Sequence, residues 1–209
     1  MCFSLRDIRI NGNPIRAKIL KQENDKNNYI EIKATKEKLM HIQTARLLLK
    51  EIKENDFSSL YDLFTNEEVK KTYLVPDFED ENAFMKMFLH LKKLSEDENG
   101  HTAGIFIDEE LIGLFHKVEI THDRVEVGYA IHPRHKNQGY ATEALRAGIL
   151  YFFEKGFSEV YAGAFKTNPA SLKVMEKAGM QKTKMKASVT YRGEAHPCIY
   201  YSIKNQKNI

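Results

Sequence analysis

The stretch between residues 103 and 131 constrains the fold most, because it predicts three consecutive strands joined by short turns. Ala103–Ile107, Leu111–Ile120 and Val125–Ile131 are rich in residues that favour strands, and polar turn formers separate them. Strands joined by such short turns pair antiparallel, since a parallel pair needs a crossover of a dozen or more residues. A purely parallel, doubly wound sheet is therefore excluded.

Helical periodicity appears on both sides of these three strands. Apolar residues recur at helical spacing over 57–64, 84–94, 141–152 and 169–178, and further strand patterns cover 44–52, 160–165, 181–190 and 196–203. Asn168 and Pro169 suit the N-cap and first position of the last helix. The order predicts an α+β (mixed α/β) fold, with a mostly antiparallel sheet of six to seven strands flanked by about four helices.

Charge is distributed unevenly along the chain. Residues 1–43 carry a net charge of +4 and residues 44–209 a net charge of −1. We interpret residues 1–43 as a basic extension with short β segments, either solvated or an arm for an acidic partner, and residues 44–209 as the main domain. The total of +3 is too small to indicate nucleic acid.

Composition also limits the compartment and the kind of site. No apolar run approaches the roughly 20 residues that cross a bilayer, so no membrane partner is expected. The two cysteines, Cys2 and Cys198, have no metal-ligand spacing. We therefore expect a cytoplasmic protein without a disulfide framework and without a metal.

The polar loop 134–139 leads from a strand into a helix, where free backbone N–H groups and a partial positive charge favour an anion. Gly139 leaves the approach open, Ala141 and Thr142 are small, and Lys136 adds positive charge. The loop thus predicts a cradle for a phosphate or pyrophosphate, with a simple tight turn as the alternative. Neither a Walker motif nor a full Gly-x-Gly-x-x-Gly fingerprint is present.

The run Lys136-Asn-Gln-Gly-Tyr-Ala141 resembles the acyl-CoA loop of the GNAT superfamily of acetyltransferases, whose pattern is Gln/Arg-x-x-Gly-x-Gly/Ala. Lys136 departs from the first position; it keeps a positive charge and lacks the planar guanidinium fork. Asn168-Pro-Ala-Ser171 is similar to the family's Asn-x-x-Ser helix. Thr44-Ala-Arg-Leu-Leu-Leu49 and Gly128-Tyr-Ala-Ile-His-Pro133 resemble the branch with ribosomal-protein-alanine and spermidine N-acetyltransferases. The resemblance spans about residues 44–203.

The resemblance implies acetyl-CoA as co-substrate and direct transfer of its acetyl group to a primary amine, on a protein N-terminus, a polyamine or a small molecule. It also implies that the pantetheine arm pairs as a pseudo-strand with the backbone at the end of 125–131. The residues that it assigns to acetyl-CoA are Ile131, His132, Lys136, Asn137, Gln138, Gly139, Tyr140, Ala141, Thr142, Asn168 and Ser171.

Glu126 is the first candidate for the base that takes a proton from the amine. Strand alternation places Glu126 on one face together with Gly128 and Ala130, so we expect open space around its carboxylate. His116 and Glu119 on the preceding strand are alternatives. Their odd separation predicts that they point to opposite faces.

Ser171 is the candidate for stabilising the departing sulfur, on the strength of the resemblance. Relatives often use a tyrosine there, and Tyr191, Tyr200 and Tyr201 are available. Cys198 is the least favoured candidate, as a covalent nucleophile.

Two other functions remain open at this point. Loop residues without a working base would give a catalytically inactive CoA-binding regulatory or scaffold protein. A binder of nucleotide phosphates would use the same loop. A homodimer is common in the family that this chain resembles, and no residue here indicates it.

Overall fold

The computed structural model describes residues 9–10, 13–14 and 39–206. The strands are β1 (Arg9–Ile10), β2 (Asn13–Pro14), β3 (Ile42–Gln43), β4 (Leu48–Lys50), β5 (Thr102–Ile107), β6 (Glu110–Thr121), β7 (Arg124–Ile131), β8 (Glu159–Phe165), β9 (Gln181–Tyr191) and β10 (Glu194–Lys204). The helices are α1 (Phe57–Thr65), α2 (Glu67–Lys70), α3 (Glu81–Ser95), α4 (Tyr140–Glu154) and α5 (Pro169–Lys177), with short 3-10 turns at Glu54–Asp56 and Pro133–His135.

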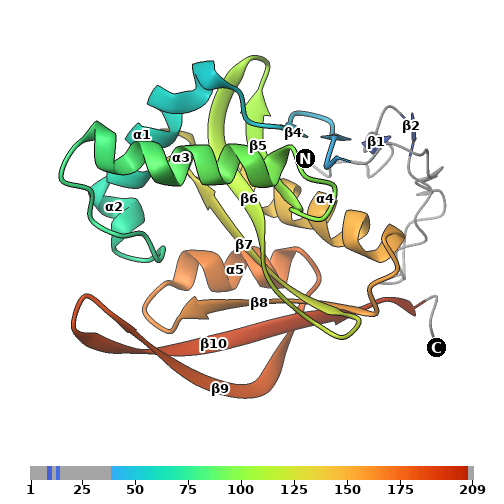
Figure 1. Ribbon diagram of the computed structural model, residues 1–209. Coiled ribbons are helices and arrows are strands. Elements are labelled where there is room, and N and C mark those ends of the chain that lie inside the picture. The colour runs from blue at the N-terminus through green and yellow to red at the C-terminus, as the bar shows by residue number, and fades with distance from the viewer. Residues whose placement is uncertain (1–8, 11–12, 15–38, 207–209) are drawn as a thin grey trace.

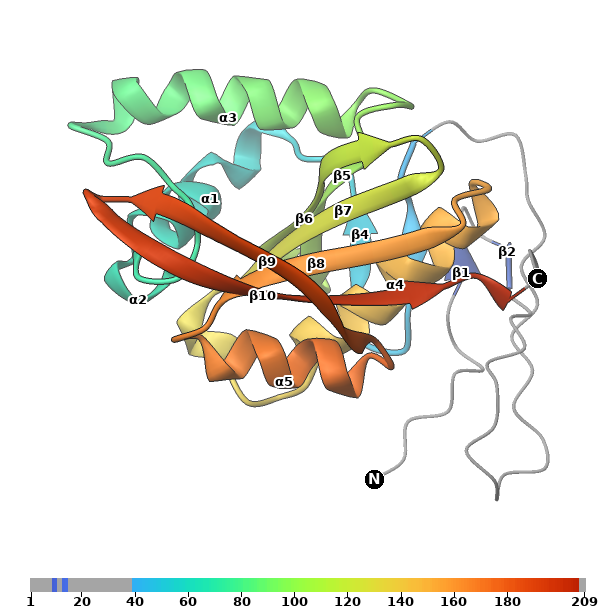
Figure 2. The same cartoon turned by 90° about the horizontal axis from the view of Figure 1, so that it is seen from below.

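The strands form one sheet in the order β2-β1-β3-β4-β5-β6-β7-β8-β10-β9. Helices α1 to α3 lie on one face and α4 and α5 on the other, as Figures 1 and 2 show. Within the described sheet only β7 and β8 pair in parallel, and α4 makes the crossover between them. The predicted mixed, mostly antiparallel architecture is confirmed. None of the described helices is long and apolar enough to cross a membrane.

The N-terminal part of the domain differs from the prediction of one strand over 44–52. The chain forms a hairpin instead, because the backbone N–H of Thr44 donates to the carbonyl of Leu47 at 2.8 Å. The Thr44 hydroxyl accepts the Leu47 N–H at 2.8 Å, so this side chain competes with ladder pairing. Met40 and Ile42 are buried, and the packed unit therefore includes residues before Thr44. The separate extension over 1–43 stays a prediction, most of which lies outside the described residues.

The sheet carries a separate apolar core on each face. Phe115, Val127 and Phe152 belong to the core under α4 and α5, and Phe84 and Phe106 to the core under α1 to α3. Helical periodicity did not predict the four-residue helix α2, which packs against the second of these cores. These two cores pack against the central strands from both sides and hold them in place.

We expect the buried His101 to make folding stability sensitive to acid. Its side chain lies 3.0 Å from the Tyr151 hydroxyl, and burial lowers the pKa of His101 to about 4. The unfolded chain binds this proton near pH 6.5, so the folded state loses stability as the pH falls from 6.5 towards 4. Asn at this position tolerates the positive φ of 47° and does not titrate.

Urea unfolding of the wild type and of His101→Asn at pH 7 and pH 4.5 measures this effect. The stability advantage of the wild type over the variant should shrink at the lower pH. An advantage that is the same at both values would contradict the assignment of this proton to His101.

Candidate functional site

Strands β7 and β8 separate soon after they begin. Their parallel register covers only Arg124 to Glu126 of β7 and Glu159 to Tyr161 of β8. On their outer sides β7 continues to pair with β6, and β8 continues to pair with β10. A gap therefore opens between two strands that are each held from the other side.

The backbone N–H and C=O groups of Ile131 face this gap. The next N–H, from His132, donates to the carbonyl of Ile112 in β6 at 2.8 Å, and alternation turns the backbone of Ile131 the opposite way. The prediction that the backbone of His132 is also available is wrong. Its N–H is bound to the sheet, and its carbonyl accepts the His135 N–H at 2.9 Å.

The start of α4 has no side-chain cap. Gly139 occupies the N-cap with a φ of +84°, a conformation that favours glycine. Helices α2, α3 and α5 are capped by Asn66, Asp80 and Asn168. No described residue accepts the N–H groups of residues 139–142, which comprise Gly139, Tyr140, Ala141 and Thr142. The predicted anion cradle needs N–H groups without a protein acceptor at this helix start, and these four residues supply them.

The two cations of the loop form ion pairs with helices α1 and α2. Lys136 forms an ion pair with Glu68 of α2, and Arg134 forms one with Asp62 of α1. Asn137 and Gln138 are exposed between Lys136 and the helix start. The loop is therefore tied to α1 and α2 by charge at the same place where its backbone donors are free.

Arg46 reaches the same loop from the turn between β3 and β4. Its Nη1 donates to the carbonyl of Gln138 at 2.8 Å, and its Nε donates to the carboxylate of Glu143 at 2.7 Å. Its guanidinium lies 4.6 Å from the centre of the Tyr140 ring. Sequence reasoning noted Arg46 only inside a family-like run and attached no contact to it.

Ser171 and Tyr129 form a hydroxyl pair on the α5 side of β7. Their oxygens are 3.0 Å apart, and the N–H of Ser171 donates to the side chain of Asn168 at 3.1 Å. The prediction that Asn168 is the N-cap of α5 is therefore confirmed. Burial raises the pKa of Tyr129 to about 12, so its hydroxyl keeps its proton at neutral pH. Tyr129 was not a candidate, because a strand tyrosine in an apolar run predicts only core packing.

Glu126 lies on the opposite face of β7, towards α1 to α3. The β6–β7 register shifts between Lys117 and Glu119, and this bulge places Glu119 opposite Glu126 and His116 opposite Gly128. Cross-strand partners share a face, so the prediction that His116 and Glu119 point to opposite faces is wrong. Burial, and then the charge of Glu119, raises the pKa of Glu126.

The open space expected beside Gly128 is filled by the ring of His116. A Cβ on Gly128 would lie 2.5 Å from His116 Nε2. The Nδ1 of this ring faces the carbonyl of Lys117 at 3.0 Å and must donate, so Nε2 accepts from the Tyr73 hydroxyl at 2.5 Å. Burial lowers the pKa of His116, and the ring is neutral.

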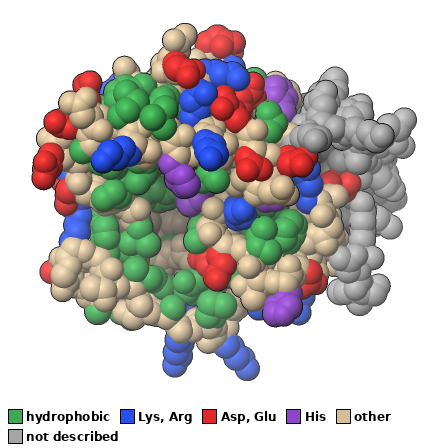
Figure 3. Space-filling model, viewed as in Figure 1, with side chains coloured by type: hydrophobic (Ala, Val, Ile, Leu, Met, Phe, Trp, Pro, Cys, Tyr) green, Lys and Arg blue, Asp and Glu red, His purple; other side chains and the backbone are tan. Residues whose placement is uncertain are grey.

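The surface is hollowed in front of these strands. Figure 3 shows the hollow between α3 and the β9–β10 hairpin, with apolar side chains around it. The register puts Tyr161 beside Glu126 and Tyr200 beside Gly163 on this same face. Burial, and then the charge of Glu126, raises the pKa values of both tyrosines.

The structure separates the other candidate side chains. The Tyr191 hydroxyl donates to the carbonyls of Lys70 and Val75, and the Tyr201 hydroxyl donates to Glu176. Tyr200 alone of the three candidate tyrosines has no such partner among the described residues. Burial raises the pKa of the Cys198 thiol, which disfavours a nucleophilic thiolate.

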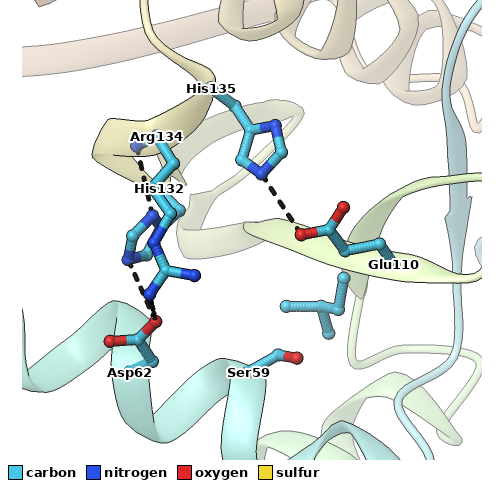
Figure 4. Close-up of a pocket in the computed structure, with 7 residues that line it drawn as sticks. Ser59, Asp62, Glu110, His132, Arg134 and His135 are labelled. Carbon is cyan, nitrogen blue, oxygen red and sulfur yellow. Dashed lines mark hydrogen bonds and ion pairs between the residues drawn. The ribbon is translucent and has the colours of Figure 1, made fainter.

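A small pocket lies between α1 and the 3-10 turn before the loop (Figure 4). The Nδ1 of His132 accepts the Arg134 N–H at 3.2 Å, so Nε2 carries the proton and points at Asp62, 3.4 Å away. His135 lies 3.4 Å from Glu110 on the other wall. Among the described residues, no three histidine, cysteine or carboxylate side chains are placed to hold a metal ion.

Comparisons with known proteins agree with this geometry. The family model for an acetyltransferase (GNAT) domain matches residues 46–181. The uncharacterized N-acetyltransferase YoaA of Bacillus subtilis (strain 168) is 31% identical over 168 residues, which are 78% of this chain and 95% of that protein. The chain therefore belongs to the GNAT family, and the predicted enzyme class, N-acetyltransferase, is confirmed.

Solved structures show the same fold. RimL, a ribosomal L7/L12 alpha-N-protein acetyltransferase, matches with a TM-score of 0.67 at 16% identity, over 78% of this chain and 92% of that one. Spermidine N-acetyltransferase from Vibrio cholerae, in complex with CoA and spermine, matches with a TM-score of 0.65 at 17% identity, over 78% and 98%.

Gly139→Ala should weaken the binding of CoA, because it adds a methyl group and backbone strain at the helix start. The matched control is Gly193→Ala in the β9–β10 turn, where φ is +80° and nothing lies within 4 Å of the added Cβ. Both variants should lose about 1–2 kcal/mol of folding stability. Isothermal titration with CoA should show a higher Kd for Gly139→Ala alone. An equal Kd for the two variants would mean that Gly139 serves only the turn.

Proposed function

We propose that this protein transfers an acetyl group from acetyl-CoA directly to a primary amine. The observation that carries the proposal is the uncapped start of α4, which follows the open end of the gap between β7 and β8. Free backbone donors for phosphates and a free strand edge for an extended arm meet there.

The residues at the gap fit acetyl-CoA. The N–H groups of residues 139–142 suit its phosphates, with Lys136, Asn137 and Gln138 beside them. The backbone of Ile131 suits the pantetheine arm, and Asn168 and Ser171 close the other side of the gap. When bound, acetyl-CoA supplies an acetyl group activated as a thioester. The His132 backbone is left out of this set, because the sheet and the loop use it.

Glu126 acts as the base in this proposal. A primary amine is mostly protonated at neutral pH and must lose a proton before it attacks. The carboxylate of Glu126 lies on the α1 to α3 face of β7, has no ion-pair partner among the described residues, and has a raised pKa that suits it to accept a proton. The His116 ring is less suited, because its Nε2 already accepts from Tyr73.

Ser171 serves the leaving sulfur. Its hydroxyl donates a hydrogen bond to the departing thiolate and accepts one from Tyr129. A tyrosine pKa of about 12 lies well above the roughly 8.5 of a thiol, so Tyr129 polarises Ser171 without giving up its proton. The pair therefore stabilises negative charge on sulfur by hydrogen bonding.

The acceptor enters from the hollow in front of α3 and the β9–β10 hairpin. A protein N-terminus, a polyamine and a small amine all supply the primary amine that the proposal requires. The related folds include an enzyme named for a protein N-terminus and one named for spermidine, which supports keeping both classes. A cytoplasmic location and a homodimer remain predictions of the sequence.

Thermal unfolding with rising acetyl-CoA tests the co-substrate first. Ligand at 100 times its Kd adds about 2.7 kcal/mol to stability, a rise of roughly 5–11 °C for a domain of this size. A saturable rise with acetyl-CoA and none with ATP supports the proposal. No rise at millimolar acetyl-CoA would overturn it, and a rise without turnover of any amine would identify a non-catalytic CoA-binding protein.

Glu126→Gln should lower kcat by about 10²- to 10⁴-fold and leave the Kd of acetyl-CoA unchanged. In the wild type, kcat/KM should rise with pH through the raised pKa of Glu126. When folding raises the pKa of a carboxyl group, the folded protein loses stability as the pH rises through that pKa. Glu126→Gln should therefore be no less stable than the wild type at pH 7.

Glu119→Gln is the matched control for this base. It removes the neighbouring charge that raises the pKa of Glu126, so the acidic limb of the pH profile should move to lower pH with kcat retained. Full activity of Glu126→Gln towards an accepted amine would show that another group is the base.

Ser171→Ala should lower kcat by about 10- to 100-fold, the effect of losing one hydrogen bond to a charged group. Tyr129→Phe should cost less, because Tyr129 acts through Ser171. Steady-state rates of the two variants and of the double variant check this order. A larger loss for Tyr129→Phe than for Ser171→Ala would reverse the two roles.

A further inference from the structure

A partly buried clamp joins the β3–β4 turn to the start of α4. The Thr44 hydroxyl donates to the Glu143 carboxylate at 2.7 Å, and the backbone N–H of Arg46 donates to the same oxygen at 3.1 Å. The Nε of Arg46 donates to the second oxygen at 2.7 Å. The side chain of Glu143 is only 14% exposed, so solvent screens these contacts weakly. The clamp is therefore a rigid connection between segments nearly 100 residues apart in sequence.

The guanidinium of Arg46 extends this clamp to the loop backbone. Its Nη1 donates to the carbonyl of Gln138 at 2.8 Å while its plane rests against the ring of Tyr140. Glu143, the carbonyl of Gln138 and the ring of Tyr140 therefore fix the position of the guanidinium together. The five donors of a planar guanidinium can meet these demands together, and the point charge of a lysine cannot.

The hydrogen bond to Gln138 sets the direction of the next N–H group. The peptide between Gln138 and Gly139 is trans, as are all peptides of the described chain. In a trans peptide the carbonyl and the following N–H point in opposite directions. Arg46 therefore holds the Gly139 N–H pointing away from the bound carbonyl, and no described residue accepts this N–H or those of the next three residues.

We infer that Arg46 is a positioning residue for the phosphates of the co-substrate: it orients the Gly139 N–H and needs Glu143 to do so. This inference rests on the proposed binding of acetyl-CoA. Glu143 neutralises the charge of Arg46, so Arg46 contributes geometry to the cradle and no net charge.

The test compares Arg46→Lys and Glu143→Gln with the wild type at a temperature where all are folded. Arg124→Lys is the matched control, since Arg124 also pairs with a carboxylate (Glu159, 2.7 Å) and rests on a tyrosine ring (Tyr161, 5.1 Å) away from the loop. Isothermal titration measures the Kd of CoA. Kinetics compare acetyl-CoA with S-acetylpantetheine, a donor that lacks the phosphates.

We expect the Kd of CoA to rise about 10- to 100-fold in Arg46→Lys and in Glu143→Gln, and to stay within about twofold in Arg124→Lys. For Arg46→Lys and Glu143→Gln, the kcat/KM for S-acetylpantetheine should stay within about twofold of the wild-type value, because that donor makes no use of the Gly139 N–H. The double variant should bind CoA about as weakly as either single variant, since the two residues act as one unit.

Two results would overturn the inference while leaving the proposed function intact. One is wild-type affinity for CoA in Arg46→Lys, which would make the clamp purely structural. The other is an equal loss with both donors, which would indicate a general distortion of the gap. A wild-type protein that fails to bind CoA would instead refute the proposed function, and the inference with it.

Discussion

The separation of β7 from β8 after three paired residues is the constraint on which the rest of the structure depends. Backbone N–H and C=O groups inside a protein need partners, and two strands that part leave a row of such groups facing a gap. The gap persists because each strand is anchored on its other side, β7 by β6 and β8 by β10. The two apolar cores hold these pairs in place from both faces.

The alternation of β7 distributes the chemistry over both faces of the sheet. Glu126 lies on the face covered by α1 to α3, and Tyr129, three residues later, lies on the other face and meets Ser171 of α5. The gap lies between the two faces, so a thioester bound there, as proposed, can be reached from both.

The features that could be predicted from the sequence are local ones. The strands over 103–131, the capped helix at Asn168 and the exposed loop before α4 follow from periodicity and turn chemistry within short windows. The loop residues were predicted from glycine, small residues and positive charge at a helix start, which have a direct physical meaning. Glu126 was predicted from strand alternation, which needs only the sequence itself.

The errors at the candidate site arose where one residue depends on the partner that packing gives it. A bulge in β6 reversed the parity of Glu119, and a bulge is a property of the strand pair. His132 was taken for a free backbone group because its partner, Ile112, lies 20 residues earlier. Arg46 was passed over because its partners at 138–143 lie far along the chain. In each case the deciding contact depends on how segments pair or pack, which hydrophobic periodicity does not specify.

The sequence by itself determined the class of fold, because hydrophobic period acts over a few residues, and its short motifs carried the resemblance to the family. Glycine and helix-start chemistry predicted the place of the anion cradle. Only the tertiary structure decided which backbone groups remain free, whether Glu119 and Glu126 lie on the same face of the sheet, and which side chains hold the loop. The reason is physical: a hydrogen-bonding group is free only if no partner reaches it, and the packing of the whole chain determines which partners do.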